Sequence, residues 1–164
     1  MHDFLVRWFG DLPALPAVFL ISMLPVSELR GAIIYGHTLT DASPLAIYLT
    51  AIAGNFVPVV PLLLLLGPAE RALRRFRILD RFFDWLFHRT VSRSGLIRRY
   101  QAVGLVLFVA IPAPMTGAWT GAVAAYLFRF PLRLAVPCIM LGICLAGGIM
   151  TLAMMGVLHL WSLV

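Results

Sequence analysis

The sequence predicts an all-α integral membrane protein, built as an inverted repeat in which each half holds a re-entrant helical hairpin followed by a transmembrane helix. Hydrophobic residues make up 62% of the chain and charged residues 12%, whereas soluble domains carry about 25% charged residues. Charges are absent from 42–69, 100–128 and 134–164, and each stretch exceeds the roughly 20 residues that cross a bilayer as a helix. In addition, landmarks of the first half recur in the second.

The chain opens with an apolar block, 12–40, which Pro25, Glu28 and Arg30 interrupt. If these charges lay at a membrane surface, residues 31–40 would form only about 15 Å of helix, which is too short to cross the hydrocarbon core. We therefore expect a hairpin that enters the membrane, breaks near Pro25–Arg30 and leaves on the same side. Such a break is tolerated at membrane depth only where it is buried in protein or lines a wet cavity.

A spanning helix is expected after the first hairpin. The sequence Asp-Ala-Ser-Pro at 41–44 predicts a turn and a helix start, because proline suits the first helical position. The helix should run to about Gly67, and Pro58 and Pro61 predict a kink in it. Asn55 lies in mid-span, where a polar amide usually hydrogen-bonds a neighbouring helix. We include Asn55 in the candidate site, although the role expected for it is structural.

The segment 70–99 has a different character. Charged residues between 70 and 89 recur at steps of three and four, with aromatic residues and leucines on the other side, which predicts an amphipathic interfacial helix that joins the repeats. Residues 90–99 form a basic linker. All 13 basic residues of the chain are Arg, and nine lie between Arg71 and Arg99. Such segments stay in the cytoplasm and face anionic lipids. We expect a multi-pass cell-membrane protein with membrane lipids as partners and no nucleic-acid partner.

The second repeat, about 100–160, resembles the first, about 12–69. Prolines interrupt its apolar block at 111–128, and a second span follows at 132–160. The residues that align at a nearly constant offset are Pro25 with Pro114, Pro44 with Pro131, Gly54 with Gly142, and Gly67 with Gly156. This similarity predicts one membrane domain made of two related halves.

The topology follows from counting membrane crossings. A re-entrant hairpin makes no net crossing and a span makes one, so the second repeat should enter from the opposite face, as in many secondary transporters. The turn at 129–131 and Arg133 would then share the cytoplasmic side with the linker, and both termini would face outward. The alternative is a chain of six ordinary spans, for which the half-segments are too short.

Glu28 and Arg30 point most strongly to a function. An ionisable group at membrane depth costs about 2.5–3.5 kcal/mol on insertion scales. Burial raises the pKa of a carboxyl group and a nearby guanidinium lowers it, so we expect Glu28 to exchange protons. Arg30 is predicted to hold an anionic group such as a phosphate in bidentate fashion. The alternatives are a structural ion pair and a hairpin tip that lies closer to the surface.

The predicted second break combines prolines, glycines and threonines. Proline frees backbone carbonyls and glycine permits close approach, while Trp119 is placed to stack on a cationic or aromatic substrate. The alternative is plain helix packing, since Gly117 and Gly121 form a GxxxG pair. The complete candidate substrate and proton site comprises Pro25, Ser27, Glu28, Arg30, Gly31, Asn55, Pro112, Pro114, Thr116, Gly117, Trp119, Thr120 and Gly121.

The sequence gives no indication of an enzyme. It contains no G-x-S-x-G, P-loop, H-E-x-x-H or CxxC motif, so we expect no catalytic residue and no cofactor. Cys138 and Cys144 are the only cysteines, and their apolar surroundings predict buried free thiols rather than a metal site. A chain of this size offers few helices to enclose a cavity, so a homodimer is an expected assembly.

The segments MLPVSELRGAIIYG and AIPAPMTGAWTGAVAAYLF resemble those of the small multidrug export protein family, which is distantly similar to the DedA superfamily of membrane proteins. The patterns PxSELRGAIxxG and PxPxTGAWTG carry this resemblance, which covers nearly the whole chain. It implies two re-entrant hairpins from opposite faces, in a proton-coupled transporter-like or lipid-translocating scaffold. By position, Glu28 and Arg30 match the family's charged motif, and Trp119 with its neighbours matches the second hairpin.

Three functions remain open at this point. The first is a secondary transporter that moves a small molecule or amphiphile, with proton coupling through Glu28. The second is a DedA-like lipid or polyprenyl-phosphate translocase, which Arg30 favours because an anionic headgroup needs a cation. The third is a non-transporting membrane scaffold that docks through its Arg-rich helix.

Overall fold

The computed structural model describes residues 12–73, 75, 97–111 and 116–161. The described part of the chain is helical and contains no strand, which confirms the all-α prediction. Its helices are α2 (Ala14–Met23), α3 (Glu28–Leu39), α4 (Pro44–Phe56), α5 (Val59–Leu73), α7 (Ile97–Ala110), α8 (Ala118–Leu127) and α9 (Leu132–Trp161). Most of the predicted amphipathic helix at 70–89 and of the linker at 90–99 lies outside the described residues.

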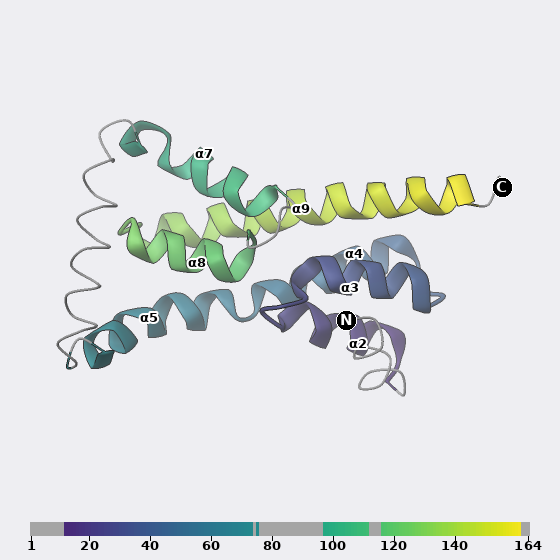
Figure 1. Ribbon diagram of the computed structural model, residues 1–164, viewed down its shortest axis with the longest axis horizontal. Coiled ribbons are helices and arrows are strands. Elements are labelled where there is room, and N and C mark those ends of the chain that lie inside the picture. The colour runs from purple at the N-terminus through teal and green to yellow at the C-terminus, as the bar shows by residue number, and fades with distance from the viewer. Residues whose placement is uncertain (1–11, 74, 76–96, 112–115, 162–164) are drawn as a thin grey trace.

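The order of helices repeats within the chain. Two short helices precede a long apolar segment in each half: α2 and α3 precede α4–α5, and α7 and α8 precede α9. In Figure 1 the α2–α3 hairpin and the α7–α8 hairpin extend from opposite ends of the long axis, and their bends meet near the middle of the molecule. The predicted boundaries of the two halves stay a prediction. The re-entrant path and the inverted membrane topology stay predictions.

The first long segment begins where the sequence predicts and ends later. Ser43 caps α4 by accepting a hydrogen bond from the backbone N–H of Ala46 at 3.3 Å, and Pro44 occupies the first turn. The helix is interrupted between Phe56 and Val59, at the predicted proline kink. The structure continues α5 to Leu73 rather than ending it near Gly67. The extension is stabilised by Glu70 of α5, whose carboxylate accepts a hydrogen bond from the Tyr126 hydroxyl of α8.

The predicted turn before the second long helix is present. Arg129 has a φ of 54°, in the left-handed region. Its N–H donates to the carbonyl of Tyr126 at 2.9 Å, and the N–H of Phe130 donates to that of Ala125 at 2.9 Å. These are the two bonds of a Schellman motif, which satisfies the last carbonyls of a helix. Pro131 directly precedes α9, so a short turn separates α8 from α9.

The two halves pack by equivalent contacts. Each hairpin packs on the long helix of its own half, and its second helix also reaches the other half: α3 contacts α9 and α8 contacts α5. Gly54 lies so close to α2 that a Cβ there would meet the carbonyl of Phe19, and a Cβ on Gly142 would meet the carbonyl of Val106 in α7 at 3.0 Å. Gly54 and Gly142 are aligned by sequence, so the aligned positions make matching helix contacts.

Two segments are long and apolar enough to cross a membrane, Pro44–Ala72 and Leu132–Val157. Only 33% of the most apolar window of each segment is buried within the protein. Large apolar side chains therefore face outward, among them Leu45, Leu65 and Leu152, which is 72% exposed. Water is a poor solvent for so much contiguous apolar surface, whereas lipid is a suitable one.

Candidate functional site

The bend of the first hairpin is shorter than the sequence predicts. The break was expected to extend from Pro25 to Arg30, but the helix α3 already begins at Glu28, so Arg30 and Gly31 are helical. The bend closes early because the Ser27 hydroxyl donates to the carbonyl of Ile21 at 2.8 Å, which ties it to the preceding helix. Glu28 itself has a φ of 48°. This left-handed conformation is costly for a residue with a Cβ and is concentrated at functional sites.

A similar hydrogen bond from a side-chain hydroxyl to a backbone carbonyl is present at the second bend. The Thr116 hydroxyl donates to the carbonyl of Ile111 at 2.7 Å, as Ser27 does in the first bend. Helix α8 then begins at Ala118. Three predicted site residues, Trp119, Thr120 and Gly121, consequently lie in α8 rather than in the break. Pro112 and Pro114 lie outside the described residues.

Arg30 joins the two bends. Its Nη2 donates to the hydroxyl of Thr116 at 3.0 Å, to the carbonyl of Ile111 at 3.4 Å and, in a shorter contact, to the carbonyl of Thr116. A broken helix leaves carbonyl oxygens without intrahelical donors. The guanidinium of the first hairpin thus satisfies carbonyls at the break of the second.

Trp119 makes the reciprocal connection. Its indole Nε1–H donates to the carbonyl of Met23, the last residue of α2, at 3.2 Å. Each hairpin therefore supplies one side-chain donor to the backbone at the other hairpin's bend. The sequence predicted that these two breaks face each other, and the described residues do bring them together.

The carboxylate of Glu28 lies at the centre of this junction. Glu28 is only 9% exposed. Its carboxylate accepts a hydrogen bond from the backbone N–H of Trp119, in the first turn of α8, and interacts electrostatically with Arg30. A helix N-terminus favours negative charge because its N–H groups are unpaired. The carboxyl group of one hairpin is thus held by the helix start of the other.

A small cavity lies beside this carboxylate. It has a volume of about 10 Å³ and contains wall residues from both halves of the chain: Glu28, Leu29, Arg30, Asn55, Val109, Gly117, Ala118, Ile143 and Ala146. Asn55 is 2% exposed, and its amide oxygen Oδ1 has no hydrogen-bond partner in the described part of the chain. The junction therefore places a carboxyl group, a guanidinium cation and an amide whose oxygen has no partner among the described residues around a space for about one water.

Several predicted site residues lie away from the cavity. Pro25 is exposed, and the hydroxyl of Thr120 donates within its own helix to the carbonyl of Gly117 at 3.3 Å. Gly31 and Gly121 serve close packing instead, since a Cβ at Gly31 would lie 2.7 Å from the Ser27 Cβ. The apolar wall residues were not predicted from the sequence, because they resemble any other hydrophobic position in a membrane protein: Leu29, Val109, Ala118, Ile143 and Ala146.

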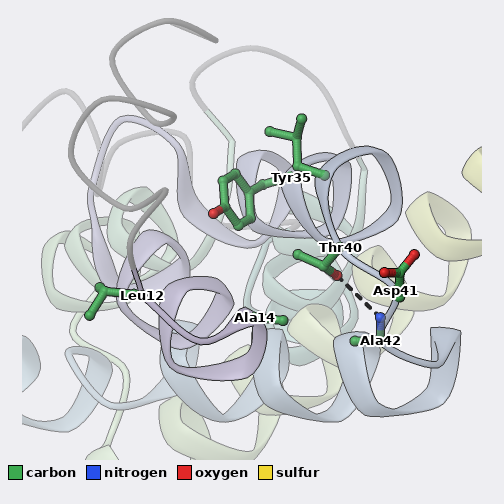
Figure 2. A pocket seen from close by; sticks show the side chains of 7 residues that line it. Leu12, Ala14, Tyr35, Thr40, Asp41 and Ala42 are labelled. Atoms are coloured by element: carbon green, nitrogen blue, oxygen red, sulfur yellow. Dashed lines mark hydrogen bonds between the residues drawn. The ribbon is translucent and has the colours of Figure 1, made fainter.

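A larger, open pocket lies near the far end of the first hairpin, away from the junction. Its volume is about 400 Å³, and Figure 2 shows the ring of Tyr35 and the side chains of Leu12, Thr40 and Asp41 around it. This volume is within the range of small-molecule pockets, about 300–1,000 Å³. Across the described residues, no group of three His, Cys, Asp or Glu side chains lies close enough together to hold a metal ion.

Comparison with known proteins gives one match. The sequence model of the family described as "Putative small multi-drug export protein" matches residues 28–149. The match begins at Glu28, the first residue of α3, and extends through α8 into α9 as far as residue 149. No curated protein and no solved structure matches the chain.

Proposed function

Because the chain belongs to the small multi-drug export protein family, we propose that it is a secondary transporter in which Glu28 couples the export of a small molecule or amphiphile to proton movement. The observation that carries this proposal is the position of the Glu28 carboxylate, which is buried where the bends of the two hairpins meet. An ionisable group inside a membrane protein is costly and usually marks an ion or substrate pathway.

The proposal requires the junction to open. A cavity of about 10 Å³ takes no more than one water, so a drug-sized molecule does not fit beside Glu28 in this conformation. In transporters built from two repeats, access alternates because one repeat moves against the other around a central site. The Arg30 and Trp119 hydrogen bonds join the two hairpins and would have to break during this movement.

The contacts of Arg30 favour the transporter over the lipid translocase. A translocase of anionic headgroups would need Arg30 as a bidentate partner for phosphate. In this structure Arg30 is hydrogen-bonded to the carbonyls of Ile111 and Thr116, which places it as a connector between hairpins. A phosphate would have to displace these acceptors.

The test uses proteoliposomes that contain a trapped pH indicator, with an outward or inward pH gradient imposed. The probes are ethidium, as a lipophilic cation, and a fluorescent short-chain anionic phospholipid. We expect the wild-type protein to move ethidium together with protons, and Glu28→Gln to lose both fluxes. The matched control is Glu70→Gln, which neutralises a carboxylate far along α5 and should retain proton-coupled flux.

Two results would decide against the proposal. Equal ethidium and proton fluxes in Glu28→Gln and wild type would remove Glu28 from the mechanism. Movement of the phospholipid but not of ethidium, lost on replacing Arg30 with Ala, would favour the lipid translocase instead.

A further inference from the structure

The amide of Asn55 has an unusual position for a mid-helix polar residue. It lies in α4, directly before the proline interruption, and is 2% exposed. Its Oδ1 is buried, and no described residue donates a hydrogen bond to it. Leaving a buried acceptor unsatisfied costs about 1–3 kcal/mol, and most such groups in native proteins bind an ordered water. Satisfying this oxygen therefore needs a donor that the described residues do not supply.

The cavity that Asn55 lines has the size and the polar groups to supply one. A buried water needs about 10–15 Å³ and two to four polar partners. The cavity volume is about 10 Å³, and its polar lining consists of the Glu28 carboxylate, the Arg30 guanidinium and the Asn55 amide. The remaining lining residues are apolar or glycine: Leu29, Val109, Gly117, Ala118, Ile143 and Ala146. Among these described lining residues, only Glu28 and Arg30 carry charge or titrate.

We propose that this cavity binds a single water molecule that donates one hydrogen to Asn55 and the other to Glu28, with Asn55 as the positioning residue that holds the water. This inference rests on the proposed function, because it identifies the hydrogen-bond partner that Glu28 keeps in both its ionised and its protonated form. A carboxylate only accepts hydrogen bonds, so a water that donates to it fits the ionised form. When Glu28 takes up a proton, its new O–H donates to the same water, and the water keeps its bond to Asn55.

The test is infrared difference spectroscopy on the full chain in lipid nanodiscs. A water held in this way should give an O–H stretching band that shifts in ¹⁸O-labelled water. We expect this band to disappear in Asn55→Leu and to shift in Glu28→Gln, whose neutral amide oxygen accepts a weaker hydrogen bond from the water. In Asn55→Leu the ionised Glu28 carboxylate loses the hydrogen bond that the water donates to it. This loss destabilises the ionised form more than the neutral form, because hydrogen bonds to charged groups are stronger. The pH midpoint of the Glu28 carboxyl band should therefore rise by about one unit.

Two further variants separate positioning from folding. Asn55→Ser replaces the amide with a hydroxyl, which also accepts a hydrogen bond from a water, and should retain the band, with a midpoint close to wild type. Thr151→Val is the matched control, because Thr151 in α9 also has a buried hydroxyl without a partner in the described part of the chain but does not line this cavity. It should leave the band and the midpoint unchanged.

Failure of this inference can be told apart from failure of the proposed function. A midpoint that stays unchanged or falls in Asn55→Leu, or a water band that survives in this variant, overturns the water bridge. If instead Glu28→Gln transports ethidium and protons as wild type does, the coupling role of Glu28 fails. The water band can be measured in either case, because the infrared measurement needs no transported molecule.

Discussion

The carboxylate of Glu28 lies against Gly117, in the space that a side chain at position 117 would occupy. A Cβ built on Gly117 would lie 2.6 Å from Cδ and 2.7 Å from Oε1 of Glu28. Gly117 also has a φ of 157°, where residues with a Cβ are strained. Two independent reasons therefore require glycine where the two hairpins meet.

Gly117→Ala is the most direct test of this contact. The added methyl group should displace the Glu28 carboxylate and strain the backbone, with a loss of roughly 1–3 kcal/mol in stability and loss of proton-coupled flux. Thermal unfolding in detergent and the proteoliposome assay measure the two effects. The control is Gly104→Ala, since nothing lies within 4 Å of a Cβ at that helical position. That variant should be neutral or stabilised by up to about 1 kcal/mol, and equal melting of both variants would contradict the contact.

Arg30→Gln should destabilise the junction between the hairpins. The change removes the charged donor to the carbonyls of Ile111 and Thr116, and hydrogen bonds to charged groups contribute about 1.5–3 kcal/mol. Arg30→Lys keeps the charge but not the planar fork, so an intermediate melting temperature is expected. If Arg30→Gln melts like the wild type while it loses flux, Arg30 acts on a substrate and not as a connector.

The aligned glycines of the long helices should respond alike to substitution. Gly54→Ala and Gly142→Ala each place a methyl group against the backbone of the first helix of the same half. Overpacking of this kind costs about 1–3 kcal/mol, so both variants should unfold at lower temperature. Gly156→Ala serves as the control, because its Cβ would have no neighbour within 4 Å. A large effect at only one of the two glycines would argue against equivalent packing in the halves.

The predicted topology has a labelling test. Figure 1 places the α3–α4 loop and the α8–α9 loop at opposite ends of the molecule. In a background without Cys138 and Cys144, Asp41→Cys should react with a membrane-impermeant maleimide from outside the cell. Arg133→Cys should react only after permeabilisation, because arginine-rich ends stay in the cytoplasm. Labelling of both positions from the same side would end the inverted-repeat model.

Local signals in the sequence were sufficient to predict the order of the described helices and where each bend begins, but not where each bend ends. Proline and glycine limit backbone conformation at the residues where they occur, so Pro44 and Pro131 mark helix starts without any tertiary information. The recurrence of such residues also predicted that Gly54 and Gly142 are equivalent. The first break ends earlier than predicted because the Ser27 hydroxyl donates a hydrogen bond to the carbonyl of Ile21. No local feature of the sequence indicates that hydrogen bond.

The partners of Arg30 could not be predicted in the same way. The sequence shows an arginine at membrane depth, which suggests an anionic ligand, but the acceptors in the structure are backbone carbonyls 81 and 86 positions further along the chain. A residue of any type can supply a backbone carbonyl, so a pattern of side chains does not indicate which carbonyls will act as acceptors. The cavity walls from Val109 and Ile143 were missed for a similar reason, since hydrophobicity does not distinguish a wall from a lipid-facing position.

The small size of the cavity beside Glu28 determines whether the protein leaks protons across the membrane. A continuous file of waters across a bilayer conducts protons and dissipates the gradient on which any coupled process depends. Here polar groups and apolar side chains of α7 and α9 line a space of only about 10 Å³, which holds no more than one water. In this conformation the protein should act as an insulator, so cells that produce it in the absence of cargo should keep their proton-motive force undiminished.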